Sequence, residues 1–288
     1  MLKNLATRLR NHGGFSTCAR TRPFQVAIDG PAASGKSTTA KMVAQRLGFD
    51  YIDTGAFYRC VTLAALAKGI DPSDPLNANR ISEVAEQSRI GLKTIFSKST
   101  DDNSGQTPGR ATVPTTRVYL DSKDVSSEIR TGNVSKHVSA VAAIGNVRQA
   151  VLHKVRSIGA TDNEQVASSN LDMESSSKGL VMDGRDIGTV VLPHADLKVF
   201  LVADSRVRAE RRLLDLAQGG LDPTQEVLDI EAVQRDLERR DELDRTRKVS
   251  PLKMAEDAMV LDTSDLTIEG QVDVIVKEFE RRCGVHSL

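Results

Sequence analysis

One stretch of nine residues constrains this chain more than any other part of it, namely Gly30-Pro31-Ala32-Ala33-Ser34-Gly35-Lys36-Ser37-Thr38. Its first eight residues satisfy the pattern G-x-x-x-x-G-K-[ST], a glycine loop whose backbone N–H groups cradle phosphate oxygens. Glycine lets the backbone wrap a phosphate without Cβ clashes, and the N-terminus of a following helix adds free N–H groups and a positive dipole end. The pattern predicts that Lys36 neutralises the β- and γ-phosphates of a nucleotide and that the Ser37 hydroxyl ligates Mg²⁺.

The residues on either side of this loop favour the strand and the helix that such a loop requires. Residues 24–28 form a short apolar run typical of a strand, and residues 38–47 carry apolar side chains at helical spacing. Gly48 is suited to end that helix as its C-cap. The alternative is an ordinary glycine turn that matches the pattern by chance, and the flanking elements disfavour it.

The rest of the chain continues the alternation of strand and helix, with an interruption. Residues 51–52 and 56–68 form a second strand-loop-helix unit, which favours a parallel α/β sheet. Further strands of this sheet are predicted over 179–182, 197–202 and 259–261, and a small separate hairpin over 90–95 and 117–120. Helices are predicted over 81–88, 134–144, 147–158, 206–218, 228–241 and 268–282. Two polar stretches, 97–112 and 161–178, are expected to be loops or insertions, the second of them disordered.

Composition excludes several classes of protein. Lys+Arg and Asp+Glu both number 39 and Trp is absent, so neither a basic surface nor a base-stacking platform for nucleic acid is indicated. No apolar run reaches the length of a membrane span, so no membrane partner is expected. Cys18, Cys60 and Cys283 offer neither zinc spacing nor an even disulfide set, which favours a reducing compartment.

Residues 1–23 differ from the remainder. They contain arginines and a lysine but no acidic residue, since the first is Asp29, and their leucines share one helical face. This composition is typical of a transit peptide and predicts a mitochondrial location, with the plastid or the cytoplasm as alternatives. The other interpretation is a disordered basic tail that carries no targeting signal.

Four further blocks follow the glycine loop in order. They are Asp53-Thr54-Gly55-Ala56-Phe57-Tyr58-Arg59, Val125-Ser126-Ser127-Glu128-Ile129-Arg130, Asp183-Gly184-Arg185-Asp186-Ile187-Gly188-Thr189 and Arg239-Arg240-Asp241-Glu242-Leu243-Asp244-Arg245-Thr246-Arg247. From about residue 24 to its C-terminus, the chain resembles the bacterial type of cytidylate kinase, a nucleoside monophosphate (NMP) kinase family. It departs from that family in the basic extension and the two polar stretches.

The resemblance implies an α/β fold with a P-loop NTPase core, a five-stranded parallel sheet, an inserted NMP-binding subdomain and a helical lid. The divisions expected are 1–23 for the extension, 24–74 for the core with the glycine loop, 75–178 for the NMP-binding subdomain, 179–204 for the core, 205–250 for the lid and 251–288 for the core. A monomer is expected on the same ground.

The resemblance also assigns the substrate-binding residues. They are Asp53, Thr54, Arg59, Ser139, Arg148, Arg185, Asp186 and Asp244. Arg59 is implied to bind the acceptor's phosphate, a role that suits the planar fork of donors of an arginine; taken alone, it would be a solvated surface residue. Asp186, with Ser139 and Arg148, is implied to bind cytosine, and Arg185 the phosphates. A carboxylate accepts from the amine of cytosine, whereas uracil presents an oxygen there, so Asp186 is predicted to disfavour UMP.

Two further roles concern the metal and the lid. Asp183 ends an apolar strand, where an acidic residue supports Mg²⁺; a turn-capping aspartate is the alternative. The run from Arg235 to Arg247 has acids and arginines four residues apart, which is typical of a salt-bridged solvent face. The resemblance makes Arg240 and Arg247 exceptions that meet ATP and the transferred phosphoryl group, and it places Asp244 at the cytidine.

The catalytic set predicted from the sequence is therefore Lys36, Arg185, Arg240 and Arg247, with the whole loop from Gly30 to Thr38 binding ATP and with Ser37 and Asp183 at Mg²⁺. The implied reaction converts ATP and CMP to ADP and CDP, with dCMP also accepted. Two alternatives stay open: a glycine-loop kinase for UMP, AMP or a small metabolite, and a nucleotide-binding module without phosphotransfer.

Overall fold

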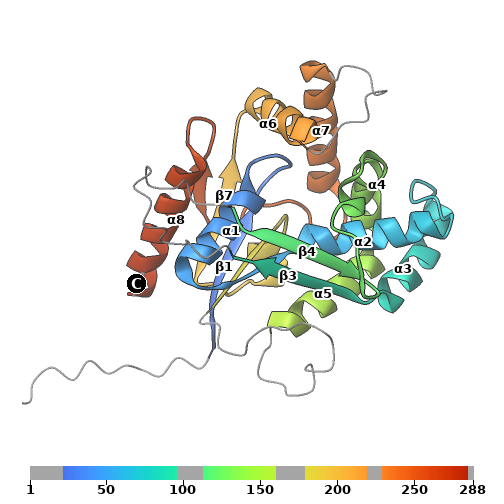
Figure 1. Cartoon of the computed structure of the whole chain (residues 1–288), viewed down its shortest axis with the longest axis horizontal. Helices are drawn as coiled ribbons and strands as arrows, with labels where there is room; N and C mark the ends of the chain where they lie inside the picture. Colours follow the sequence, from blue (N-terminus) through green and yellow to red (C-terminus); the bar gives the residue numbers. More distant parts are fainter. Residues whose placement is uncertain (1–21, 97–112, 160–178, 219–228, 285–288) are drawn as a thin grey trace, which may run out of the picture.

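A computed structural model describes residues 22–96, 113–159, 179–218 and 229–284 (Figure 1). Its centre is a five-stranded sheet of strand order β2-β6-β1-β7-β8, in which every neighbouring pair is parallel. The strands are β1 (Phe24–Asp29), β2 (Asp50–Asp53), β6 (Gly179–Gly184), β7 (Leu197–Val202) and β8 (Met259–Asp262). The five parallel strands predicted from the sequence are thereby confirmed, although burial differs among them: β6 is buried throughout, whereas the edge strand β8 exposes Val260.

Helices cover both faces of this sheet. α1 (Lys36–Leu47) and α8 (Ile268–Cys283) pack on one face against Val26 and Ile28 of β1. α2 (Thr54–Ala67), α3 (Ala78–Gln87) and α5 (Gly145–Gly159) join the apolar cluster that contains Ala27. Successive residues of β1 thus serve opposite faces, as the period of two in a strand requires.

The region between α2 and β6 builds a second, antiparallel sheet of three strands. These are β3 (Ile90–Ile95), β4 (Thr115–Leu120) and β5 (Lys123–Asp124), followed by α4 (Gly132–Ala143), and two short helical turns, η1 (Pro75–Asn77) and η2 (Glu128–Arg130), flank this region. The hairpin predicted from the sequence is confirmed. β5 was not predicted, because its two residues are exposed and polar and have no apolar pattern. Leu92 and Val118 belong to the same apolar cluster as Ala27, so this region shares a core with the main sheet.

Two antiparallel helices, α6 (Ser205–Gln218) and α7 (Ile230–Thr246), stand at the end of the sheet where β1 meets the glycine loop (Figure 1). Ala209, Val233 and Leu237 form a small apolar cluster with Ala32 of that loop. α7 continues past the predicted end at residue 241 because its later charged residues are not solvated: Asp241 and Asp244 are buried.

Several expectations fall on residues outside the described part of the chain. They concern the extension up to residue 21, with Cys18, and the polar stretches 97–112 and 161–178. In the part that the structure describes, no helix is both long and apolar enough to cross a membrane.

Candidate active site

The glycine loop lies between β1 and α1, as the pattern predicts. Gly30 must lack a side chain because a Cβ would lie 2.5 Å from the Leu201 carbonyl oxygen of β7. Gly35 adopts φ 84°, a left-handed conformation, at the N-cap of α1. The Lys36 side chain is buried and donates from Nζ to the Pro31 carbonyl oxygen at 2.8 Å. Burial, followed by the charge of Arg185, lowers the pKa of Lys36.

A cavity of about 250 Å³ opens in front of this loop. Its lining includes the loop from Ala32 to Thr38, the ends of β2 and β6, and both α6 and α7. The residues outside the loop are Asp53, Gly55, Arg59, Asp183, Gly184, Arg185, Arg212, Asp215, Leu237 and Arg240. Four arginines, one each from α2, α6 and α7 and one directly after β6, therefore line the same cavity as the glycine loop, which makes this phosphate cavity a site for highly charged anions.

Ser37 and Asp183 meet at the floor of the phosphate cavity. The Ser37 hydroxyl donates to Asp183 Oδ2 at 2.7 Å, and the Tyr51 hydroxyl donates to Oδ1 at 2.6 Å. Burial, followed by the charge of Asp53, raises the pKa of Asp183. Asp183 lies within β6 and holds hydroxyl groups, so the turn-capping alternative is not what the structure shows.

The described residues fit Mg²⁺ at this point. They contain no group of three or more His, Cys, Asp or Glu side chains that could hold a metal by themselves. Mg²⁺ in nucleotide enzymes, however, is bound by one or two protein oxygens together with substrate phosphates and water. One hydroxyl and one buried carboxylate beside a phosphate loop are such a donor set.

Arg59 and its block lie where the acceptor's phosphate is expected. Arg59 lines the phosphate cavity from α2 and donates to the Ile129 carbonyl oxygen at 3.1 Å and to Ser135 Oγ at 3.0 Å. Arg59 is half-buried, so it is not the solvated surface residue of the alternative interpretation, and burial, followed by the charge of Arg240, lowers its pKa to about 10. Asp53 caps α2 by accepting from the Ala56 N–H. Thr54 donates to the Asp183 carbonyl oxygen at 2.8 Å.

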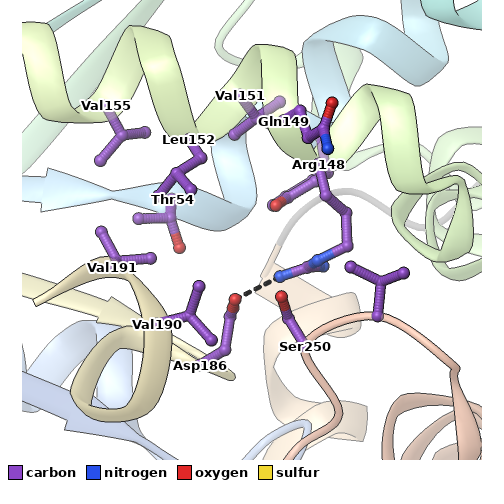
Figure 2. Close-up of a pocket in the computed structure, with 12 residues that line it drawn as sticks. Thr54, Arg148, Gln149, Val151, Leu152, Val155, Asp186, Val190, Val191 and Ser250 are labelled. Atoms are coloured by element: carbon purple, nitrogen blue, oxygen red, sulfur yellow. Dashed lines mark hydrogen bonds and ion pairs between the residues drawn. The ribbon is translucent and has the colours of Figure 1, made fainter. Parts of the chain in front are cut away.

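Asp186 occupies a second cavity, of about 180 Å³, beside the first (Figure 2). Arg148 of α5 donates to Asp186 Oδ2 at 2.5 Å and lies over the Tyr58 ring at 5.2 Å from its centroid. Arg247 Nη2 lies 3.7 Å from Asp186 Oδ1. Valine and leucine side chains from α5 and from η3 (Ile187–Val191), a π-helical turn, form the remaining wall. This base cavity thus offers one carboxylate and one guanidinium group, that of Arg148, against an apolar surface, and Arg247 approaches the same carboxylate from outside the lining.

The lid residues divide between the two cavities. Arg240 lines the phosphate cavity, and Arg185 donates to Asp244 Oδ2 at 2.8 Å. Arg247, predicted together with Arg240 to meet the phosphoryl group, lies instead beside Asp186 and donates to the Ser250 carbonyl oxygen at 2.6 Å. The reason is that α7 ends at Thr246 and Arg247 has an extended backbone, so its side chain leaves the direction of the helix.

Ser139 was predicted from the resemblance to bind the base. It is half-buried on α4 and is not among the residues that line either cavity.

Sequence reasoning missed the contact between the lid helices and the loop. Asp241 Oδ1 accepts from the Ala32 N–H at 2.9 Å, and Arg208 donates both to Asp241 Oδ2 and to the Ala32 carbonyl oxygen. The spacing of four residues predicted a pair of Asp241 with Arg245, but Asp241 is buried and pairs with Arg208. No pattern in the sequence distinguishes it from the solvated acids around it.

Comparison with known proteins identifies the family. The profile of the family described as Cytidylate kinase matches residues 26–281. The Cytidylate kinase of Limosilactobacillus fermentum is 44% identical over 90% of this chain and 96% of its own length. That of Chlorobaculum tepidum is 40% identical over 88% of this chain and 92% of its own length. A solved shikimate kinase from Bacteroides thetaiotaomicron aligns at 10% identity and a TM-score of 0.40, covering 91% of this chain and 99% of that one, so the fold assignment depends on the strand order itself.

The same comparison corrects one prediction. The mitochondrial location expected from residues 1–23 is wrong, because the relatives that match the chain are bacterial cytidylate kinases, and bacteria have no mitochondrion. The composition of residues 1–23 was therefore insufficient to predict a cellular location. On the family profile and on relatives that match along nearly their whole length, the chain belongs to the cytidylate kinase family.

Proposed function

We propose that this protein transfers the γ-phosphoryl group of ATP to CMP, giving ADP and CDP, with dCMP as a second acceptor. One observation carries the proposal beyond family membership: a buried carboxylate, Asp186, stands between Arg148 and Arg247 directly beside the phosphate cavity. A pyrimidine held there would direct its phosphate toward the glycine loop.

On the donor side, the loop from Gly30 to Thr38 binds the phosphates of ATP. Lys36 lies buried at their side and supplies a positive charge, which a bound triphosphate would stabilise. Ser37 and Asp183 would hold Mg²⁺, which supplies charge neutralisation for the β- and γ-phosphates. Together, the glycine loop, Lys36, Ser37 and Asp183 would orient ATP so that the γ-phosphorus faces CMP and its bond to ADP points away from CMP.

On the acceptor side, Arg59 and Arg185 hold the phosphate of CMP at the opposite wall of the phosphate cavity. The nucleophile is an oxygen of that phosphate. It is already anionic, so no general base is required. As its bond to the γ-phosphorus forms, the bond to the bridging oxygen breaks and the electron pair leaves with ADP. Positioning and charge neutralisation are thus the whole of the catalysis expected from this chain.

The base is selected in the base cavity. Asp186 accepts from the N4 amine of cytosine, and the guanidinium groups of Arg148 and Arg247 donate to N3 and O2. Uracil places an oxygen against the Asp186 carboxylate, so two acceptors face each other without a proton, which disfavours UMP. Ser139 is assigned to the base by resemblance alone.

The lid closes the reaction off from water. Arg240 stabilises the negative charge on the transferred phosphoryl group. When CMP binds, Asp244 gives up its hydrogen bond with Arg185 and accepts one from the cytidine instead. The division of the chain into core, NMP-binding subdomain (75–178) and lid (205–250), and a monomeric state, belong to the same proposal. Closure limits the hydrolysis of ATP.

A panel of acceptors tests the proposal. ADP formation is measured with ATP, Mg²⁺ and each of CMP, dCMP, UMP and AMP, with the Lys36→Ala variant as the control for contaminating kinases. We expect CMP to give the highest kcat/KM, and dCMP to follow. A higher kcat/KM for UMP or AMP would reassign the acceptor, and tight binding of ATP without turnover of any acceptor would show a binding module.

A further inference from the structure

One buried carboxylate outside the two cavities connects them. Asp29 is the last residue of β1, directly precedes Gly30 of the loop, and is 5% exposed. Its Oδ1 accepts from the Ile187 N–H at 2.8 Å and its Oδ2 from the Gly188 N–H at 2.7 Å. Both oxygens are therefore bonded to the backbone of η3, which begins directly after Asp186.

Asp29 also holds the chain on the other side of Asp186. In the parallel pairing of β1 with β6, Asp29 lies opposite Gly184, and only Arg185 and Asp186 separate Gly184 from Ile187. The Asp186 carbonyl oxygen in turn accepts from the Val190 and Val191 N–H groups of η3 at 2.9 and 3.1 Å. The two-residue Arg185–Asp186 step thus has contacts to Asp29 on both sides, through Gly184 before it and through Ile187 and Gly188 after it. Asp29 belongs to the strand that leads into the glycine loop.

This contact has little freedom to shift. A Cβ on Gly188 would lie 3.2 Å from Lys198 Cδ and 3.4 Å from Asp29 Oδ2. Burial raises the pKa of Asp29 to about 6, although the two N–H bonds oppose the rise. A buried carboxylate is costly unless it is hydrogen-bonded, and packing alone would be served as well by an apolar side chain. The carboxylate at this position therefore points to a task that needs two acceptors in fixed positions.

We propose that Asp29 is a positioning residue for base selection. It fixes the Arg185–Asp186 step relative to the glycine loop, so that the carboxylate that reads the base keeps a set position with respect to the donor phosphates. Asp29 contacts neither nucleotide in this role. The inference rests on the proposed function, because it requires that Asp186 reads cytosine.

The Asp29→Asn variant tests it. An asparagine keeps the shape but offers one acceptor and turns its amide N–H₂ toward the second backbone N–H. Since the contact is lost from one side of the step, we expect the KM for CMP to rise about three- to tenfold and the preference for CMP over UMP to narrow by a similar factor. The KM for ATP should change less than about twofold, because the loop keeps its own backbone contacts.

A double-mutant cycle separates positioning from a general structural role. Because Asp29 acts through Asp186, adding Asp29→Asn to an Asp186→Asn enzyme should leave the CMP-to-UMP ratio where Asp186→Asn alone puts it. Additive losses of preference would overturn the inference. The matched control is Asp196→Asn, which alters a carboxylate that accepts from the Gln25 N–H at 2.8 Å, at the opposite end of β1. It should lower stability without narrowing the preference.

The outcomes distinguish the two proposals. If the wild type does not prefer CMP, the proposed function fails. If the wild type prefers CMP and Asp29→Asn keeps both its KM for CMP and its preference, the inference alone fails. Should Asp29→Asn not fold, Asp29→Glu decides, because the extra methylene shifts both carboxylate oxygens away from the Ile187 and Gly188 N–H groups while the charge stays; a narrowed preference for CMP supports the inference and an unchanged one overturns it.

Discussion

Replacing Asp186 by asparagine is the change that most directly tests how this cleft chooses its acceptor. The side chain keeps its size, so the apolar wall of the base cavity is undisturbed. One carboxylate oxygen becomes an N–H₂ group, which can donate to an oxygen where the carboxylate can only accept. Asp186→Asn should therefore weaken the contact with cytosine and create one with uracil.

The magnitude follows from the contacts around Asp186. The bond from a cytosine amine to a buried carboxylate is charge-assisted and contributes about 1.5–3 kcal/mol, against about 1 kcal/mol for a neutral bond. CMP thus loses about 1 kcal/mol in the variant. UMP gains a bond of about 1 kcal/mol and no longer sets a base oxygen against the carboxylate, a mismatch of two acceptors that costs about 1 kcal/mol or more. Together these terms narrow the preference by about 3 kcal/mol, or about a hundredfold in the ratio of kcat/KM.

The assay compares kcat/KM for CMP and UMP at saturating ATP, in the wild type and in the variant. Asp273→Asn is the matched control, since it changes a half-exposed aspartate of α8 that pairs with Arg46 and lines neither cavity. The control should keep the ratio. A ratio that changes less than about threefold in Asp186→Asn would refute the assignment of Asp186 to the base.

Four further outcomes are expected. Lys36→Ala should lose more than about a hundredfold in kcat with an unchanged circular dichroism spectrum, and near-normal turnover would contradict its place at the donor phosphates. Asp241→Asn, which loosens the hold of α7 on Ala32, should raise the KM for ATP about fivefold in steady-state assays and leave that for CMP unchanged. Chelating Mg²⁺ with EDTA should abolish turnover without shifting the melting temperature of the free enzyme, and activity that survives would remove Ser37 from a metal site. The pKa of Asp29 is raised from 3.8 to about 6, so ionising this carboxyl costs the folded state about 3 kcal/mol relative to the unfolded state. The stability that the protonated carboxyl contributes is fully present below pH 3.8 and is lost as the pH rises through 6. In urea unfolding, the free energy of unfolding of Asp29→Asn should therefore increase relative to that of the wild type between about pH 4 and 7.

The sheet could be predicted chiefly because strands such as β6 and β7 are buried on both faces. Residues 179–182 form a continuous apolar run, as do residues 197–202 in large part, and such runs between polar loops have few other solutions. The glycine loop then fixed which end of the sheet carries the site. β5 could not be predicted, because two exposed polar residues pair with β4 only through the backbone.

The site was predictable where a motif carries it and unpredictable where tertiary contacts do. Lys36, Ser37, Asp183 and Arg59 meet around the phosphate cavity as their blocks implied. Asp241 meets Ala32 across 209 residues of sequence, and nothing local marks this aspartate as buried. Charge spacing on a helix reports only what neighbouring turns can do, and here a partner on another helix outcompetes them.

The pairing of acids with arginines explains how a cleft with so many positive charges is stable before substrates bind. Arg185 is held by Asp244 and Arg148 by Asp186, while Arg59 is held by a carbonyl oxygen and a hydroxyl. A buried guanidinium without a partner would cost several kcal/mol, so these three arginines are each held by an acceptor before a nucleotide binds, whereas the buried Nε of Arg240 has no partner among the described residues. When a nucleotide binds, each of these arginines exchanges its protein acceptor for an acceptor of the nucleotide. The exchange adds little net attraction, so it contributes to orientation and selectivity more than to affinity. In the proposed function, an acceptor that offers the wrong edge to Asp186 would not complete this exchange, so we expect the original pairs to remain and that acceptor to bind poorly.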